Sequence, residues 1–279
     1  MSQIELSIII VTWNTAPITL ECLKTIHQYL SDKLSFEVIV VDNASTDNTI
    51  LEIKNWSASR RIKIINNPQN YGFARACNIG ARKAKGIYLL FLNSDMKLID
   101  SSLVKMVEYI KNHSRIGIIG PKFLNPDLTP QGSVFPPQTA INAFKEYILG
   151  IKNAYSKYVP TTNQPIPVWS ISGGALIIKK ELFFQAKGWN EKYFMYFEDL
   201  DLCQTIRQLG YLVIFYPRCS LIHAHGQSGK NLTPAKDQWR RLIPSSIKFH
   251  GKINHYLINI IIWLGQKIHH LSFLSYYQL

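Results

Sequence analysis

Two short segments carry residue types that bind metal ions. In FLNSDM, Asn93 and Asp95 stand two apart at the end of an apolar run, so one face of an extended chain presents both. A hard divalent cation such as Mg²⁺ takes oxygen ligands, commonly one or two carboxylates together with substrate phosphates. In LIHAHGQSG, His223 and His225 are also two apart, and neutral imidazole is a metal ligand. A strand-ending turn and a hydrogen-bonded structural histidine explain the same residues, so neither segment decides alone.

A third segment, YFEDLDLCQTIRQLG, indicates acid–base chemistry. It puts Glu198, Asp199 and Asp201 in the first turn of an expected helix whose apolar residues recur at a core-facing spacing. Such a cluster, with aromatic neighbours, can supply a general base for a hydroxyl group. The alternative is charge complementarity, because the helix dipole stabilises acids in a first turn.

The elements that must position these residues follow from the hydrophobic pattern. Over the first 120 residues, β-branched apolar runs alternate with amphipathic runs, which is typical of parallel strands joined by helices. The expected strands are 6–13, 36–42, 61–66, 87–93, 116–120, 171–178, 211–216 and 220–224. The expected helices are 17–30, 47–57, 73–85, 101–112, 139–152 and 199–209. Five prolines between Pro121 and Pro137 predict a loop-rich joint, and the last 45 residues predict helices with a basic face.

Polar residues directly follow four of the expected strands, where ligands bind in open α/β sheets. These strand ends are Thr12–Asn14, Asp42–Asn43, Asn66–Asn67 and Asn93–Asp95. Asp42 can accept hydrogen bonds from a ribose or a base, or it only caps the turn. The small residues that follow Asn70 let phosphate oxygens approach a helix start, or they pack that helix tightly on the sheet. The dinucleotide-binding and P-loop fingerprints are both absent.

Composition bounds the function further. A net charge of +13 suits partners that are anionic, and the segment from Gln227 to Lys267 carries seven Lys or Arg against one acid, Asp237. The four cysteines have no disulfide or zinc spacing, which favours reduced thiols. The longest apolar run near the C-terminus, YLINIIIWLG, is too short to span a bilayer. Residues 239–270 interleave cations with apolar side chains, which favours an anionic membrane surface; a helix packed on its own domain or a subunit contact is the alternative.

Seven segments in this order carry a resemblance to the family 2 glycosyltransferases of the GT-A fold: SIIIVTWN, VIVVDNASTDNT, NNPQNYGFARACNIGAR, LLFLNSD, SGGALIIKKELF, GWNEKYFMYFEDLDLC and IHAHGQS. The chain is most similar to their bacterial rhamnosyltransferase-like branch. The resemblance implies an α/β fold with a Rossmann-like, mostly parallel sheet flanked by helices and a C-terminal helical extension. The expected domains are 1–230, with a donor half (1–120) and an acceptor half (121–230), and a basic extension (231–279).

The resemblance also implies roles for individual residues. Asp199 matches the catalytic base, and Asp95 and His223 match metal ligands. Asn93 stands where the family's D-x-D metal motif has its first Asp, so Asp95 is expected to carry most of the metal binding. The implied donor-nucleotide residues are Thr12, Asn14, Asp42, Asn70, Ala74, Asn78, Asn93 and Ser94, and the implied acceptor residues are Trp169, Gly173, Gly174 and Glu198.

The implied reaction is a single inverting displacement. Mg²⁺ or Mn²⁺ neutralises the departing nucleoside diphosphate while the base takes the proton of the attacking hydroxyl. The expected donor is dTDP-rhamnose or a UDP-sugar, and the expected acceptor is a glycan or a lipid-linked saccharide used for cell-surface polysaccharide. The expected location is the cytoplasmic side, peripheral on the inner face of the cell membrane. A homo-oligomer is left open, and no nucleic-acid partner is expected.

Two other classes of protein were weighed against this reading. A nucleotidyltransferase that makes nucleotide sugars should carry a Gly- and Arg/Lys-rich loop after its first strand, but that loop here is NTAPITLE. A basic nucleic-acid-binding module explains the charge of +13 but leaves the strand-end carboxylates without a role.

Overall fold

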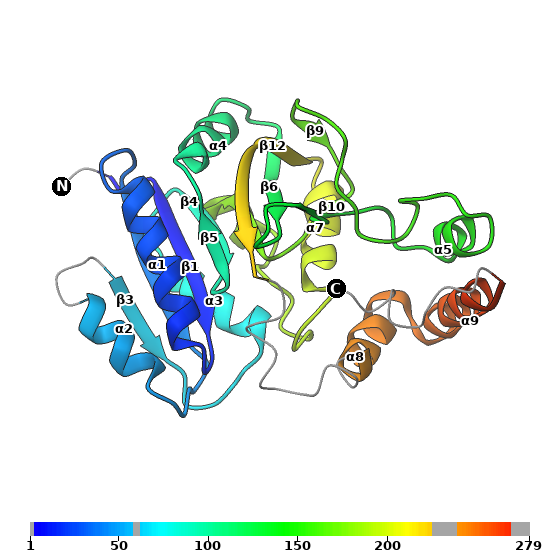
Figure 1. Cartoon of the computed structure of the whole chain (residues 1–279), viewed down its shortest axis with the longest axis horizontal. Helices are drawn as coiled ribbons and strands as arrows, with labels where there is room; N and C mark the ends of the chain where they lie inside the picture. Colours follow the sequence, from blue (N-terminus) through cyan, green and yellow to red (C-terminus); the bar gives the residue numbers. More distant parts are fainter. Residues whose placement is uncertain (1–2, 58–61, 225–238, 269–279) are drawn as a thin grey trace.

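The computed structural model describes residues 3–57, 62–224 and 239–268, which form an α/β body with a helical arm at one end (Figure 1). The strands are β1 (Leu6–Thr12), β2 (Phe36–Asp42), β3 (Ile62–Asn66), β4 (Tyr88–Asn93), β5 (Met96–Leu98), β6 (Ile116–Leu124), β7 (Pro130–Gln131), β8 (Val134–Phe135), β9 (Ile166–Pro167), β10 (Ser170–Ile171), β11 (Ala175–Lys179) and β12 (Leu212–His223). The helices are α1 (Ala16–Leu30), α2 (Thr49–Ser57), α3 (Phe73–Lys83), α4 (Ser102–Lys111), α5 (Ala140–Tyr147), α6 (Lys180–Gln185), α7 (Glu198–Gln208), α8 (Trp239–His250) and α9 (Lys252–Ile268).

Within the described residues, ten strands form one mixed sheet. Its order is β3-β2-β1-β4-β11-β6-β12-β5, with β7 paired to β6 and β9 paired to β12. β3, β2, β1 and β4 are parallel, as are β6 and β12. β11 runs antiparallel between these two groups, and β5 runs antiparallel on β12. The predicted fold class, a mostly parallel α/β sheet flanked by helices, is confirmed.

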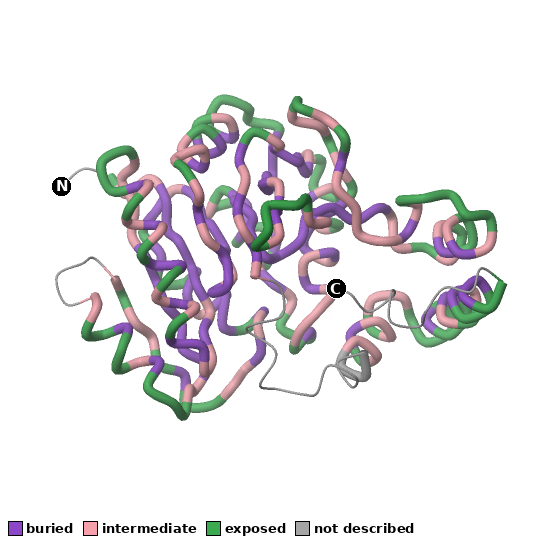
Figure 2. The backbone as a smooth tube through the Cα atoms, in the orientation of Figure 1, coloured by how far each residue is buried: buried purple, intermediate pink, exposed green. Residues whose placement is uncertain are grey.

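The sheet is buried on both faces because its strands are almost entirely apolar. In β1, Ile8 and Ile10 pack in the core formed with α1 and α4, whereas Ile9 packs in the opposite core with α3, α6 and α7. Figure 2 shows the buried backbone concentrated in these central strands. Because β1, β2 and β4 are parallel, their carboxyl ends lie at the same edge of the sheet.

Four expected strands differ in the structure. The strand expected at 171–178 is broken at Gly173–Gly174 into β10 and β11, since a Cβ on Gly174 would lie 2.8 Å from the Met96 side chain. The strand β6 continues through Pro121 to Leu124 instead of ending at the expected loop. Pro121 pairs with Tyr216 beside a register shift, where the missing N–H costs little. The two strands expected at 211–216 and 220–224 are the single strand β12, which contains that shift.

The C-terminal helices α8 and α9 form the arm together with α5, which comes from the middle of the chain (Figure 1). α5 and α9 share a small apolar core that includes Tyr147, Ile258 and Ile262. Gly265 allows close approach, because a Cβ there would lie 2.2 Å from the Tyr147 carbonyl. On α9, the cations Lys252 and Lys267 lie near the two ends, and most of the exposed side chains between them are apolar. The basic face expected for the last 45 residues as a whole stays a prediction, because part of that segment lies outside the described residues. The expected domain boundary at 230 lies outside the described residues.

No helix among the described residues is long and apolar enough to cross a membrane. The four cysteines, Cys22, Cys77, Cys203 and Cys219, are buried and unpaired with one another, as expected for reduced thiols.

Candidate functional site

Asp95 and His223 lie side by side although they are far apart in the sequence. The pairing of β5 with β12 sets Met96 opposite His223, and the Ala224 N–H donates to the Asp95 carbonyl at 3.0 Å. Oδ1 of Asp95 lies 3.5 Å from Nε2 of His223, and both side chains are buried. The structure thus brings the two expected metal ligands together. His225, the other histidine of the pair considered in the sequence, lies outside the described residues.

Gln131 determines which nitrogen of the His223 ring carries a hydrogen. The Gln131 amide nitrogen donates to Asn125 Oδ1 at 2.8 Å and to the His223 carbonyl at 3.2 Å. Its Oε1 is therefore the acceptor that lies 2.7 Å from His223 Nδ1. Nδ1 then carries the hydrogen, and in the neutral ring Nε2 has a lone pair beside Asp95. No sequence pattern marked Gln131, which lies in the two-residue strand β7 next to a glycine.

This donor set fits a divalent cation. Octahedral ligands about 2.1 Å from Mg²⁺ lie about 3 Å from each other, close to the separation of the Asp95 and His223 donor atoms. In the part of the chain that the structure describes, no three His, Cys, Asp or Glu side chains gather into a metal-binding group. A cation here would complete its coordination with waters and substrate phosphates, as Mg²⁺ commonly does. The hydroxyl of Ser94, buried next to Asp95, has no hydrogen-bond partner among the described residues.

The Gly173–Gly174 turn joins this pair to Asp199. The Gly174 carbonyl accepts the Asn93 N–H at 2.8 Å at the end of β4. In the same turn, the Gly173 N–H donates to Asp199 Oδ2 at 2.8 Å, and Leu200 N–H donates to Oδ1 at 2.9 Å. A Cβ on Gly173 would lie only 3.2 Å from the Asp199 Cβ. The expected metal side and the expected base are thus connected through two glycines.

The two carboxyl groups at the start of α7 are in different environments. Burial raises the pKa of Glu198 to about 8, and the neighbouring Asp199 adds to that rise. Burial also raises the pKa of Asp199, but the hydrogen bond from Gly173 and the positive charge of Lys157 oppose this. Glu198 Oε2 has no hydrogen-bond partner among the described residues. Asp199 thus has a hydrogen-bond donor and a nearby cation that oppose the rise of its pKa, whereas Glu198 has no such cation, which favours Asp199 as the member of the pair that serves as general base.

Lys157 is a second residue that sequence patterns did not reveal. Its segment is placed by Val134, which bridges to Tyr158, and its Nζ lies 5.1 Å from the centre of the Phe135 ring. Burial lowers the pKa of Lys157, and the charge of Asp199 counteracts that change. A cation therefore lies close to the expected base. The sequence YSKYV around it has no regular spacing that could indicate this position.

At the ends of β1 and β2, the polar residues expected to hold the donor are bonded to one another. Asp42 accepts the Ser45 hydroxyl at 2.5 Å and the Ser45 N–H at 3.0 Å. Asn14, in the left-handed region with φ 52°, accepts the Thr46 N–H at 2.8 Å. Thr12 is buried, and its hydroxyl lies within 2.9 Å of two other threonine hydroxyls. These bonds hold the two loops together at the carboxyl edge of the sheet.

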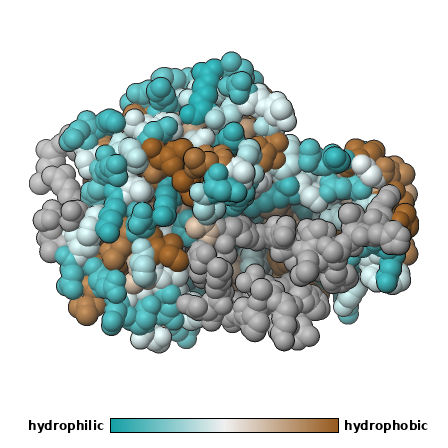
Figure 3. All heavy atoms as spheres, in the orientation of Figure 1, coloured by the Kyte–Doolittle hydropathy of each residue, from teal (hydrophilic) through white to brown (hydrophobic). Residues whose placement is uncertain are grey.

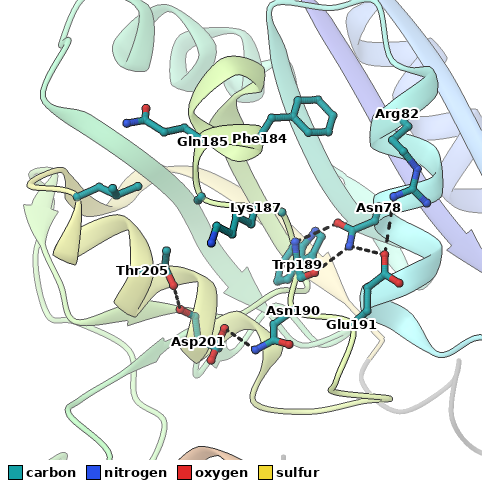
Figure 4. Close-up of a pocket in the computed structure, with 13 residues that line it drawn as sticks. Asn78, Arg82, Phe184, Gln185, Lys187, Trp189, Asn190, Glu191, Asp201 and Thr205 are labelled. Carbon is teal, nitrogen blue, oxygen red and sulfur yellow. Dashed lines mark hydrogen bonds and ion pairs between the residues drawn. The ribbon is translucent and has the colours of Figure 1, made fainter.

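Helix α3 contributes packing residues where donor contacts were expected. The Asn78 amide donates to the Trp189 carbonyl at 2.8 Å and to Glu191 at 3.0 Å, and it accepts the Trp189 N–H at 3.0 Å (Figure 4). Ala74 is wholly buried in the core. Asn70 accepts the Gly72 N–H at 2.9 Å and keeps a partly exposed side chain. These contacts favour the packing alternative for Ala74 and Asn78.

The cleft drawn in Figure 4, of about 760 Å³, is separate from the expected chemistry. Its lining includes Asn78, Arg82, Lys187 and Asp201 but neither Asp95 nor Asp199. Residue chemistry, rather than the size of this cleft, therefore locates the candidate site.

Trp169 does not lie beside Asp199. Its ring is half exposed and stacks with Arg207, whose guanidinium carbon lies 3.5 Å from the ring centre. Arg207 follows Asp199 by eight residues on α7, which is about 12 Å along the helix axis. The structure therefore places Trp169 near the opposite end of α7 from the expected base.

Comparison with known proteins identifies the family. Residues 7–174, more than half of the chain, match the family described as Glycosyl transferase family 2. An N-acetylglucosaminyl-diphospho-decaprenol L-rhamnosyltransferase of Mycobacterium tuberculosis is 25% identical over 223 residues, which cover 71% of this chain and 70% of that protein.

Two solved structures share the fold. GalNAc-T7 with UDP, GalNAc and Mn²⁺ gives a TM-score of 0.65 at 17% identity, covering 99% of this chain and 56% of that one. A mannosyltransferase from Pyrobaculum calidifontis with GDP-Man and Mn²⁺ gives 0.60 at 20% identity, covering 98% of this chain and 71% of that one. The chain therefore belongs to glycosyltransferase family 2, whose members are inverting enzymes that transfer sugars from nucleotide sugars.

Proposed function

We propose that this chain transfers a sugar from a nucleoside-diphosphate donor to a hydroxyl group of a glycan or a lipid-linked saccharide in cell-surface polysaccharide synthesis. The proposal rests above all on one observation. The Gly173–Gly174 turn contacts both parts of the site: the Gly174 carbonyl accepts the N–H of Asn93, two residues before Asp95 of the buried Asp95–His223 pair, and the Gly173 N–H donates to Asp199. Such a connection puts an anion-neutralising centre and a proton acceptor on one rigid frame.

The residues divide the work between leaving group and nucleophile. When bound to Asp95 and His223, Mg²⁺ or Mn²⁺ supplies positive charge that neutralises the departing diphosphate. Asp199 takes the proton from the acceptor hydroxyl as that oxygen attacks the anomeric carbon from the opposite face. The charge of Lys157 and the hydrogen bond from Gly173 favour the ionised form of Asp199, whereas burial raises the pKa of the neighbouring Glu198 to about 8. One displacement inverts the anomeric centre.

The donor and the acceptor are proposed by analogy with relatives. The M. tuberculosis relative is named as an L-rhamnosyltransferase acting on a lipid-diphosphate saccharide, which supports dTDP-rhamnose and a lipid-linked acceptor. The solved structures contain UDP or GDP-Man, so a UDP-sugar is the second donor considered. A lipid-linked acceptor would place the reaction on the inner face of the cell membrane. Asp42 and Asn14 are the donor-side residues retained, because their loops frame the carboxyl edge of the sheet.

Thermal unfolding with a panel of nucleoside diphosphates tests this function. We expect one nucleotide to raise the midpoint by about 5 to 10 °C at about 100 times its dissociation constant, and only with Mn²⁺ or Mg²⁺ present. Asp95→Asn should abolish the stabilisation that the nucleotide gives in the presence of metal. Asp201→Asn is the matched control, since Asp201 bonds to Asn190 and Tyr193 away from the pair. Equal stabilisation of wild type with and without metal would contradict the proposal.

A further inference from the structure

Helix α9 has apolar side chains on two opposite faces. One face carries Ile258 and Ile262, which pack against α5. The other face points to solvent and carries Ile253, Tyr256, Leu257, Ile260, Trp263 and Leu264. We call these six residues the arm surface. Ile253 is 85% exposed, Ile260 54% and Trp263 50%. Their spacing of three or four residues keeps them in one stripe along the helix.

The fold itself does not use this stripe. The packing between α9 and α5 is complete without it, because its contacts come from the opposite face and from Gly265. Helix α5 adds further exposed apolar side chains to the arm, Ile141 at 69% and Phe144 at 44%. Figure 3 shows hydrophobic atoms gathered at the end of the arm over α5 and α9. A contiguous apolar surface of this kind on a soluble domain marks an interaction site.

The charges around the arm surface indicate what covers it. The cations of α9 are Lys252 and Lys267, both exposed, and between Trp239 and Ile268 the sequence has no Asp or Glu. Lys248 of α8 instead donates to the Lys192 carbonyl. The acid on neighbouring α5, Glu146, accepts the N–H groups of Tyr155 and Ser156 at 2.7 and 3.0 Å. Its carboxylate is therefore turned into the protein. An apolar stripe bordered by cations is complementary to anionic lipid headgroups over an acyl layer.

We propose that the arm surface docks on an anionic lipid bilayer, with α9 lying in the plane of the interface. Tyr256 and Trp263 are suited to the headgroup level, and Lys252 and Lys267 can extend their charges to the lipid phosphates. No described helix spans a membrane, so the contact is with one leaflet.

The arm is also connected to α7, the helix that carries the proposed base Asp199. Ser245 of α8 donates its hydroxyl to the Met195 carbonyl at 2.8 Å, and the Phe249 ring lies 5.3 Å from the Phe197 ring. Met195 and Phe197 belong to the loop that leads into α7, where Asp199 is the second residue. A membrane bound by α9 would therefore lie at a defined orientation relative to the candidate site.

Vesicle flotation with purified full-length protein tests this docking without any sugar donor. We expect the wild type to float with phosphatidylcholine vesicles that contain phosphatidylglycerol, and to float much less with pure phosphatidylcholine or in high salt. The double variant Ile260→Asp/Trp263→Ser should lower the bound fraction at least about tenfold. Leu51→Asp is the matched control, because Leu51 is 59% exposed on α2 in the body; it should bind as wild type does.

Thermal unfolding of the double variant, with and without nucleotide, distinguishes a loss of docking from a loss of folding. The double variant should keep the wild-type unfolding midpoint and its nucleotide-dependent stabilisation, because both side chains are exposed. Wild type that fails to float, or a double variant that floats unchanged, would overturn the proposal. So would a wild-type dimer in light scattering that the double variant dissociates while lipid binding is absent, since a second copy would then cover the arm surface. A failed nucleotide test with intact vesicle binding would instead count against the proposed function alone.

Discussion

The two sides of the sheet's carboxyl edge differ in how far their polar groups are satisfied by the protein itself. At β1 and β2, Asp42, Asn14 and Thr12 are bonded to neighbouring loop residues. At β5, β12 and α7, Ser94 and Glu198 keep buried polar atoms without partners among the described residues, and the buried side chains of Asp95 and His223 lie 3.5 Å apart. Buried polar groups are costly to leave unpaired. This difference favours the second side as the centre of the proposed chemistry, while Asp42 and Asn14 on the first side stay proposed donor residues whose loops are already held in place.

The comparison predicts its largest effect at Asp199. The Asp199→Asn variant cannot take the proton from the hydroxyl of the acceptor saccharide, so we expect turnover to fall about 10²- to 10⁴-fold. The amide keeps the bond from Gly173, and stabilisation by nucleotide and metal should stay at the wild-type level. Single-turnover assays with the preferred donor would measure the loss, with Asp201→Asn as control. Unchanged turnover in Asp199→Asn would remove Asp199 from the role of base.

Glu198 should make stability depend on pH. Its pKa is about 8 in the folded protein against 4.5 in the unfolded chain, so the folded state holds a proton that the unfolded state releases. Folding stability should therefore fall as pH rises between about 4.5 and 8, on the order of a few kcal/mol in total. Glu198→Gln should flatten this fall. Urea unfolding at several pH values would measure it, and a variant whose curve follows wild type would show that Glu198 ionises normally.

Asn78 on α3 is another expected donor residue whose polar groups are bonded within the protein. Asn78→Ala leaves the buried Trp189 N–H without its acceptor, so we expect a loss of about 2 to 3 kcal/mol in the free energy of unfolding. Nucleotide affinity, measured at a temperature where the variant is folded, should match wild type. If affinity falls while stability is kept, Asn78 contacts the donor and the packing interpretation is wrong.

The smallest predicted effect is at Gln131, which acts through His223. Gln131→Leu removes the acceptor for Nδ1–H, so the ring loses its fixed orientation and metal affinity should fall about tenfold. Gln131→Glu retains an acceptor and should bind metal more tightly than Gln131→Leu. Calorimetric titration with Mn²⁺ in the presence of nucleoside diphosphate separates them. Equal affinities in the two variants would show that Gln131 does not orient His223.

Local patterns predicted much of the fold and one side of the site. Strands such as β1 and β2 are continuous apolar runs, and Asp95, Asp199 and His223 stand in recognisable motifs, so their positions followed from the sequence. Gln131 and Lys157 could not be predicted in this way, because Gln131 lies in a two-residue strand and Lys157 in an irregular segment, and both are brought to the site only by tertiary pairing. The break at Gly173–Gly174 and the apolar outer face of α9 likewise depend on neighbours distant in sequence.

The family assignment also settles the two alternatives weighed against sugar transfer. A match over residues 7–174 to glycosyltransferase family 2 removes the reasons for a nucleotidyltransferase or a nucleic-acid-binding module. The positive charge then needs another partner. Lys252 and Lys267, the exposed cations of α9, are consistent with the anionic bilayer proposed for the arm surface.

Electron paramagnetic resonance of Mn²⁺ bound with a nucleoside diphosphate tests the central claim most directly, because it detects nitrogen in the coordination shell. The lone pair on His223 Nε2 beside Asp95 predicts a nitrogen coupling in the wild type. That coupling should disappear in His223→Gln, and Asp95→Asn should abolish tight Mn²⁺ binding. A bound Mn²⁺ without nitrogen coupling in the wild type, or one unaffected by both variants, would contradict the account.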